Sequence, residues 1–134
     1  MVQQELRPPF RMLYVEDNSL VREITCELLV SDAREVVAVG SAEEALVALK
    51  DSRFDIVVTD VSLPVMSGID LAKQIKRLAP SLPVILASGH PLDMADLRLG
   101  ALVRAIRKPF DTPQLDALIH DLCGTGTAAD PLSA

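Results

Sequence analysis

Three short runs of this chain are apolar at every position, not at every second one. They occupy residues 12–15, 56–58 and 84–87. A strand that is covered on one face alternates apolar and polar residues, whereas a continuously apolar strand is covered on both faces. These runs therefore predict a parallel sheet that lies between two layers of helices.

Short aliphatic runs and segments of helical period alternate along the chain, in the order strand then helix. We expect strands over residues 12–16, 35–39, 55–60, 84–88 and 103–107. Strands that are joined by helical crossovers run parallel to one another. The expected fold class is α/β, with a single doubly wound (βα)5 domain and a five-stranded parallel sheet.

Apolar residues at spacings of three and four predict the helices that cover this sheet. The stripes expected to face it are Leu20, Ile24 and Leu28; Ala42, Ala45, Leu46 and Leu49; Ile69, Ala72, Ile75 and Ala79; and Leu115, Leu118, Ile119 and Leu122. The predicted start signals are Asn18 or Ser19 for the first helix, Ser41 with Glu44 as a capping box for the second, and Asp111 with Pro113 for the last. Between residues 92 and 99 the helical period is poor, so we expect the fourth helix to be the least regular.

Length and charge limit the possible functions. The 134 residues fit one domain, and a 49% hydrophobic composition supplies a core without metals or disulfides. We expect an N-terminal extension at residues 1–10, the folded domain at 11–123 and a flexible C-terminal tail at 124–134. The net charge of −6 argues against direct binding to nucleic acid, because phosphate contacts need clustered lysines and arginines.

Cysteine usage and hydropathy bear on the cellular compartment. Cys26 and Cys123 match no metal or redox spacing, so we expect two reduced thiols and a cytoplasmic location. No apolar stretch approaches the roughly 18 residues of a membrane span, and the first residues lack the apolar region of a signal peptide. We expect a protein that is neither secreted nor bound to a membrane.

Polar residues stand where the predicted strands end. Glu16 and Asp17 end the first strand, Asp60 the third and Ser88 the fourth, and Lys108 follows the fifth. The carboxyl ends of parallel strands meet at one edge of the sheet, so these side chains should converge there. Three clustered carboxylates repel one another unless a cation neutralises them. A set of oxygen ligands favours Mg²⁺.

The same residues fit a phosphoryl transfer in which a carboxylate is the nucleophile. Asp60 would attack phosphorus, while Glu16 and Asp17 would hold Mg²⁺. Lys108 would pair with one phosphoryl oxygen, and the Ser88 hydroxyl would donate a hydrogen bond to another. A further hypothesis is that the peptide bond before Pro109 is cis and aims the lysine side chain.

Four stretches carry a resemblance to a known family. They are VEDN at residues 15–18, TDVSLPVMSG at 59–68, ASG at 87–89 and KPF at 108–110. Together and in this order they resemble the response-regulator receiver domain of bacterial two-component signalling, over roughly residues 11–122. The resemblance implies the flavodoxin-like strand order 2-1-3-4-5 and phosphorylation of Asp60 by a histidine-kinase phosphodonor. It also implies that Mg²⁺ is held by Glu16, Asp17, Asp60 and the main-chain carbonyl of Ser62.

The resemblance further implies partners. These are a sensor histidine kinase or a histidine phosphotransfer protein, and a downstream protein target. We expect a monomer or a weak homodimer that catalyses only its own phosphorylation and dephosphorylation, and is in that sense not an enzyme.

Two departures from the family pattern concern the route to the output. Receivers usually carry Tyr or Phe three residues before the lysine, where this chain has Ala105. The segment between Ser88 and Lys108 is also slightly short for the family. Coupling would then run through the loop after Ser88 or through the fourth helix.

Other interpretations of the same residues stay open. Glu16 and Asp17 could be acids at a helix N-terminus, Lys108 a solvated loop charge and Ser88 a turn former. The group Arg98, Arg104, Arg107 and Lys108 could bind an acidic partner or form an ordinary solvated face. We assign no role to His90 or His120.

Two rival functions also remain. An aspartyl phosphatase would need a second acid two residues after Asp60, where Ser62 stands. A pseudo-receiver that docks partners without phosphorylation is suggested by Ala105.

Overall fold

The computed structural model describes residues 9–124 and contains the predicted parallel sheet. Its strands are β1 (Phe10–Val15), β2 (Arg34–Val39), β3 (Ile56–Asp60), β4 (Val84–Ser88) and β5 (Val103–Arg107). All neighbouring pairs are parallel, in the order β2-β1-β3-β4-β5. The prediction of a doubly wound α/β domain with order 2-1-3-4-5 is confirmed. The predicted extension and tail lie outside the described residues, except for residues 9, 10 and 124.

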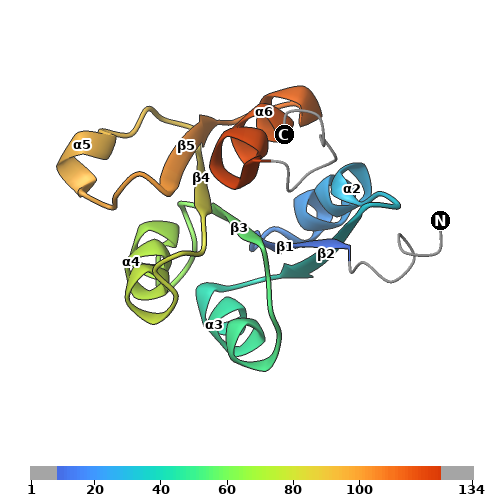
Figure 1. Cartoon of the computed structure of the whole chain (residues 1–134), viewed down its shortest axis with the longest axis horizontal. Coiled ribbons are helices and arrows are strands. Elements are labelled where there is room, and N and C mark those ends of the chain that lie inside the picture. Colours follow the sequence, from blue (N-terminus) through green and yellow to red (C-terminus); the bar gives the residue numbers. More distant parts are fainter. Residues whose placement is uncertain (1–8, 125–134) are drawn as a thin grey trace.

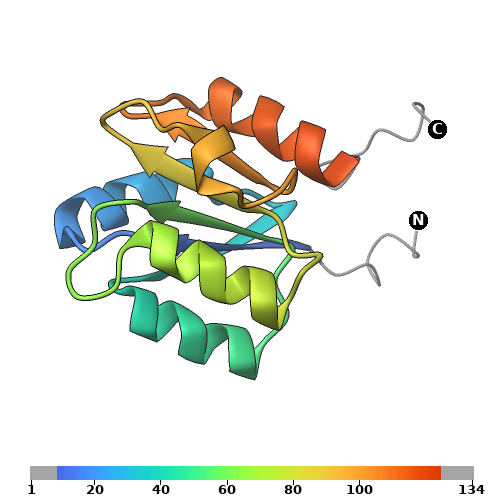
Figure 2. The same ribbon diagram turned by 90° about the vertical axis from the view of Figure 1, so that its left-hand side faces the viewer.

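Five helices connect and follow these strands. They are α2 (Ser19–Leu29), α3 (Ala42–Asp51), α4 (Gly68–Leu78), α5 (Met94–Leu97) and α6 (Thr112–Cys123). Helices α2 and α6 lie on one side of the sheet, and α3 and α4 lie on the other (Figure 1). In the turned view, α3 and α4 run side by side below the strands and α6 lies above them (Figure 2). Among the described residues, no helix is long and apolar enough to cross a membrane.

The continuous apolarity of the central strands is explained by two separate cores. Successive residues of β1 point to opposite faces: Leu13 packs beneath α3 and α4, whereas Met12 packs beneath α2 and α6. Val57 and Ile56 of β3 divide in the same way. Each of these four side chains is fully buried, which contributes about 1.5–3 kcal/mol per residue.

The helix start signals are confirmed with one correction. Asn18 is the cap of α2, because its side chain accepts a hydrogen bond from the Val21 N–H at 3.0 Å. Ser41 caps α3, but the predicted capping box is incomplete. The Glu44 carboxylate accepts from the N–H of Gly40, at 2.8 Å, and not from that of Ser41. Before α6 the box is complete, formed by Asp111 and Gln114, with Pro113 in the first turn.

The predicted orientation of the first helix is wrong. Leu20, Ile24 and Leu28 of α2 are 63%, 52% and 66% exposed, and the buried residue of this helix is Leu29. The inward face of α2 instead carries Leu29 and the half-buried Arg22, Thr25 and Cys26. These positions also have helical spacing, so the sequence period alone could not decide between the two faces.

The other stripes face the sheet as predicted. Ala42, Ala45, Ala72, Ile75, Leu115 and Ile119 are buried, and the remaining members of those stripes are half-buried. The fourth helix is indeed the least regular, since α5 is reduced to four residues. It ends at Arg98, whose φ of 53° lies in the left-handed region.

Gly68 provides a test of how the loop after β3 is packed. A Cβ atom at this position would overlap the carbonyl oxygen of Asp60 and lie 2.9 Å from the Cα of Val61. We therefore expect Gly68→Ala to lower the free energy of unfolding by about 1–3 kcal/mol. Urea denaturation of both proteins measures this.

Gly89→Ala is the matched control, because nothing lies within 4 Å of a Cβ atom built at Gly89. We expect this control to change stability by about 0.5 kcal/mol or less. Equal losses in the two variants would contradict the described packing of the loop.

Candidate functional site

The register of the sheet brings the first and third strand ends together. Val15 of β1 is paired with Thr59 of β3. The residues that follow this pair are Glu16 and Asp60, which therefore lie side by side at the carboxyl edge. Both strands are buried because their sequences are apolar. Glu16 and Asp60 stand where these strands reach the carboxyl edge of the sheet.

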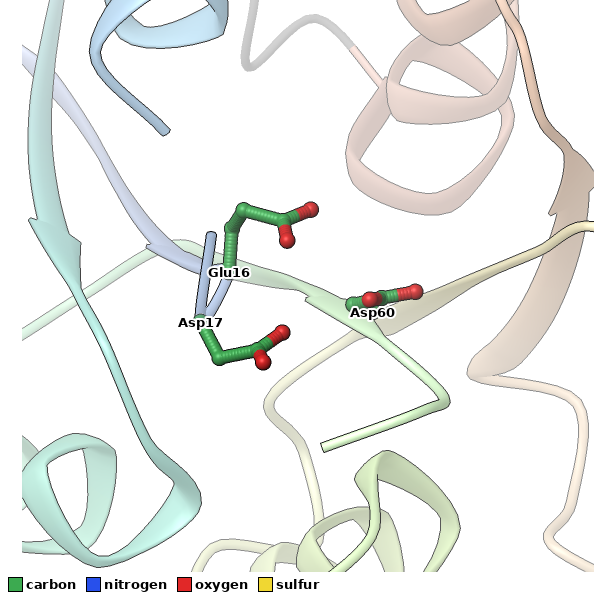
Figure 3. A group of neighbouring side chains, drawn as sticks. All are labelled: Glu16, Asp17 and Asp60. Atoms are coloured by element: carbon green, nitrogen blue, oxygen red, sulfur yellow. The ribbon is translucent and has the colours of Figure 1, made fainter. Parts of the chain in front are cut away.

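Three carboxylates converge at this edge (Figure 3). One oxygen from each of Glu16, Asp17 and Asp60 lies within 4.8 Å of the others. Glu16 is only 3% exposed and Asp60 8%, whereas Asp17 is exposed. The prediction that acids from two strands meet in one place is therefore confirmed.

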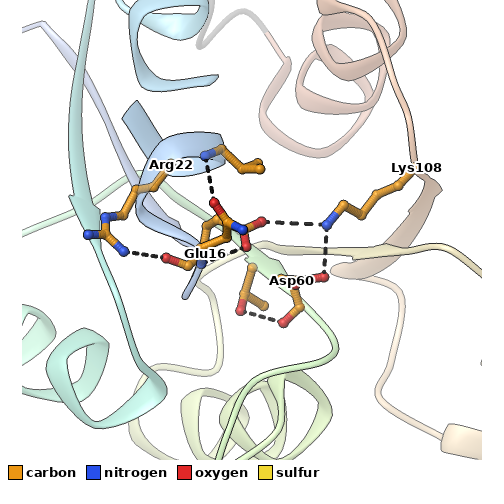
Figure 4. Close-up of polar contacts among 7 residues, drawn as sticks. Glu16, Arg22, Asp60 and Lys108 are labelled. Atoms are coloured by element: carbon orange, nitrogen blue, oxygen red, sulfur yellow. Dashed lines mark hydrogen bonds and ion pairs between the residues drawn. The ribbon is translucent and has the colours of Figure 1, made fainter. Parts of the chain in front are cut away.

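The ammonium group of Lys108 lies between two of these acids (Figure 4). Its Nζ atom is 3.3 Å from Oδ1 of Asp60 and 3.5 Å from Oε1 of Glu16. Burial lowers the pKa of Lys108, but attraction to Asp60 and Glu16 outweighs it and the pKa is raised overall. The lysine stays charged, yet the carboxylates of the cluster still outnumber it three to one.

Backbone hydrogen bonds hold the lysine loop against the neighbouring strand. The N–H of Lys108 donates to the carbonyl oxygen of Ser88 at 2.8 Å. The peptide bond between Lys108 and Pro109 is cis, as predicted, and its effect on the direction of the lysine side chain stays a prediction. The loop that carries the lysine is thus tied to the end of β4.

Ser88 is buried at the end of β4, next to the cluster in the sheet order. Its hydroxyl oxygen accepts a hydrogen bond from the N–H of His90 at 3.0 Å. A hydroxyl can accept and donate at the same time, so its proton remains available for a further acceptor. Ser62 lies on the exposed side of the loop after β3, and the role of its carbonyl stays a prediction.

Glu16 is fixed by further contacts that the sequence did not reveal. Its Oε2 atom accepts from the N–H of Asn18 at 3.1 Å. Its main-chain carbonyl accepts from Nη1 of Arg22 at 2.7 Å. The only sequence signal for the second contact is an arginine six residues after the acid, on the helix that follows the turn.

Several residues considered from the sequence lie away from the cluster or take no part in it. Arg104 approaches Asp121 of α6 at 3.9 Å, and Arg104 is half-buried whereas Asp121 is exposed. His90 and His120 are exposed. Cys26 and Cys123 are free thiols, as predicted. Burial raises the pKa of Cys123 to about 11, which favours its protonated form.

The donor set fits a small divalent cation. The three side-chain ligand atoms are carboxylate oxygens, and one side of the cluster, at Asp17, is open to solvent. Mg²⁺ uses oxygen ligands at about 2.1 Å and keeps several waters, so opposite ligands lie about 4.2 Å apart. The three carboxylate oxygens lie within 4.8 Å of one another, which is close to the separation that such an ion needs. Glu16, Asp17 and Asp60 could hold it.

Comparison with known proteins finds a family model that covers most of this chain. The sequence model of the response regulator receiver domain matches residues 12–120. Sensor protein TorS of Escherichia coli is 42% identical over 84 residues, which make up 62% of this chain and 9% of that protein. The chain spans between 9% and 53% of the length of such curated relatives.

Solved structures show the same architecture. A response regulator receiver domain protein from Clostridium thermocellum has a TM-score of 0.77 and 30% identity, covering 85% of this chain and 94% of its own. Response regulator TrrA of Thermotoga maritima, in complex with Mg²⁺-BeF, has a TM-score of 0.74 and 24% identity, covering 84% and 98%. The chain therefore belongs to the response regulator receiver domain family.

Proposed function

We propose that this chain is a phosphoacceptor receiver of a two-component or phosphorelay system, and that the accepting group is the carboxylate of Asp60. The observation that carries the proposal is the position of that carboxylate. It is buried at a strand end, 3.3 Å from the Lys108 ammonium, in one cluster with Glu16 and Asp17.

The chemistry follows from these neighbours. An Asp60 oxygen bonds to phosphorus while the bond from phosphorus to the donor's imidazole nitrogen breaks, and that electron pair stays on nitrogen. Lys108 neutralises charge on one phosphoryl oxygen, and the Ser88 hydroxyl donates to another. Mg²⁺, held by Glu16, Asp17, Asp60 and the carbonyl of Ser62, would neutralise further phosphoryl charge. The Mg²⁺-BeF complex of TrrA supports Mg²⁺ as the ion.

The reaction changes the protein itself and consumes no free metabolite. On this proposal the chain acts in the cytoplasm as a switch that alters contacts with a downstream protein. Its phosphodonor is a sensor histidine kinase or a histidine phosphotransfer protein. The similarity to sensor protein TorS and to several response regulators supports a place in such a system.

The exposed stripe of α2 suits the docking of that donor. Leu20, Ile24 and Leu28 form an apolar face on the helix that starts directly after Glu16 and Asp17. A donor whose histidine reaches Asp60 must approach this edge, so α2 lies in its path. An amphipathic helix that carries the histidine would cover the stripe by apolar contact.

Two rival functions are supported less well. A pseudo-receiver that binds partners without phosphorylation is favoured by Ala105, which leaves β5 without the usual aromatic residue. The intact group of acids and lysine argues against it. An aspartyl phosphatase would need an acid where Ser62 stands.

Acetyl phosphate tests the proposal without any protein partner. In the presence of Mg²⁺, we expect intact-mass spectrometry to show the gain of one phosphoryl group. Hydroxylamine should remove this group, because it attacks acyl phosphates. Chelation with EDTA and the variant Asp60→Asn should both abolish the gain. A wild-type mass that does not change with Mg²⁺ present would support the docking module instead.

Substitution in the α2 stripe tests the docking surface separately. We expect Ile24→Glu to slow phosphotransfer from a phosphorylated histidine phosphotransfer protein by roughly 10-fold or more, since a central apolar contact is lost. Phosphorylation by acetyl phosphate should not change.

Val47→Glu is the matched control, because Val47 is 59% exposed on α3, on the opposite side of the sheet. It should leave both reactions intact. Equal rates of protein phosphotransfer in the Ile24 variant and the wild type would exclude this surface.

A further inference from the structure

Arg22 is an arginine of α2 with an unusual partner. Its Nη1 atom donates to the main-chain carbonyl of Glu16 at 2.7 Å (Figure 4). The side chain therefore reaches back from the first turn of the helix to the strand end. It contacts the peptide group that joins Glu16 to Asp17, two of the three acids in the cluster.

A second turn of the chain meets the same guanidinium. A Cβ atom at Gly40, which follows β2, would lie only 3.0 Å from Nη1 of Arg22. The N–H of Glu16 donates to the carbonyl of Val39 at 3.0 Å, so the two turns are also joined directly. The arginine thus lies where the ends of β1 and β2 meet the start of α2.

We propose that Arg22 is a positioning residue for the divalent cation, acting by fixing the peptide group between Glu16 and Asp17. The inference rests on the proposed function for the identity of the ion. Ligands on a turn bind a metal tightly only when their geometry is held by neighbouring contacts. The charged hydrogen bond to the main-chain carbonyl of Glu16 is such a contact, and no carboxylate oxygen takes part in it.

Replacement of Arg22 by an uncharged residue can change the metal affinity in two ways, and the two changes have opposite signs. A guanidinium near the cluster repels a divalent cation, so loss of charge alone would tighten binding. Loss of positioning would weaken it. The direction of the change in affinity therefore separates a positioning role from a purely electrostatic one.

The experiment is a titration with Mn²⁺, whose free concentration is read by electron paramagnetic resonance. We expect Arg22→Met to weaken Mn²⁺ binding roughly 10-fold. Arg22→Lys, which keeps a donor and the charge, should recover part of the loss. Gly40→Ala, which crowds the guanidinium without removing it, should also weaken binding, by a smaller factor.

Arg34→Met is the matched control. The Arg34 guanidinium also donates to a main-chain carbonyl, that of Leu29 at 3.3 Å, but at the other end of α2. This variant loses the same charge, a similar hydrogen bond and also the ion pair of Arg34 with Asp116 at 2.7 Å. All of these contacts lie away from the cluster, so its Mn²⁺ affinity should equal that of the wild type. Unchanged or tighter binding in Arg22→Met would overturn the inference.

A measurement without metal keeps the inference separate from the proposed function. If the wild type bound no Mn²⁺, the proposed metal site would be wrong. Hydrogen exchange would still test whether Arg22 holds the turn after β1. We expect the amides of residues 16–18 to exchange faster in Arg22→Met than in Arg34→Met. Equal exchange in the two variants would show that Arg22 does not hold the turn.

Discussion

The contact of one ammonium group with two buried carboxylates is the interaction on which the site depends. Lys108 lies within 3.5 Å of both Glu16 and Asp60. Without a nearby cation, two carboxylates this close and this buried would repel each other. Asp17 adds a third negative charge that this ammonium does not reach in the described contacts. The cluster therefore favours binding of a further cation, and a divalent ion would neutralise the negative charge that Lys108 does not.

The topology explains why these residues meet although they are far apart in sequence. Glu16 follows β1, Asp60 ends β3, and Lys108 follows β5, so parallel strands deliver all three to one edge. The same edge carries the start of α2, and the exposed apolar stripe runs from there along the helix. On the proposed function, the phosphoryl group would be accepted at the end of β3, and its donor would be recognised by α2, the helix that follows the neighbouring strand β1.

Much of the fold and the cluster could be predicted from sequence, because each depends on local patterns. Continuous apolarity marked the central strands, and an acid at the end of a strand marked Asp60. The orientation of α2 could not be predicted, since two of its faces have helical spacing and only contact with the sheet selects Leu29. The contacts of Arg22 and Glu44 were missed for a similar reason. Each joins a side chain to a main-chain group only six or four residues earlier in the chain, and only the folded turn selects which group the side chain reaches.

The claim that the strand ends build one cation site beside Asp60 is tested most directly by nuclear magnetic resonance with substoichiometric Mn²⁺, which broadens signals of nearby nuclei. Broadening should centre on residues 16, 17, 60 and 62 and extend to 88 and 108. It should spare the opposite edge of the sheet, where Arg34 and Asp55 lie, and should be lost in Asp17→Asn. Broadening centred elsewhere, or none at all, would contradict the account.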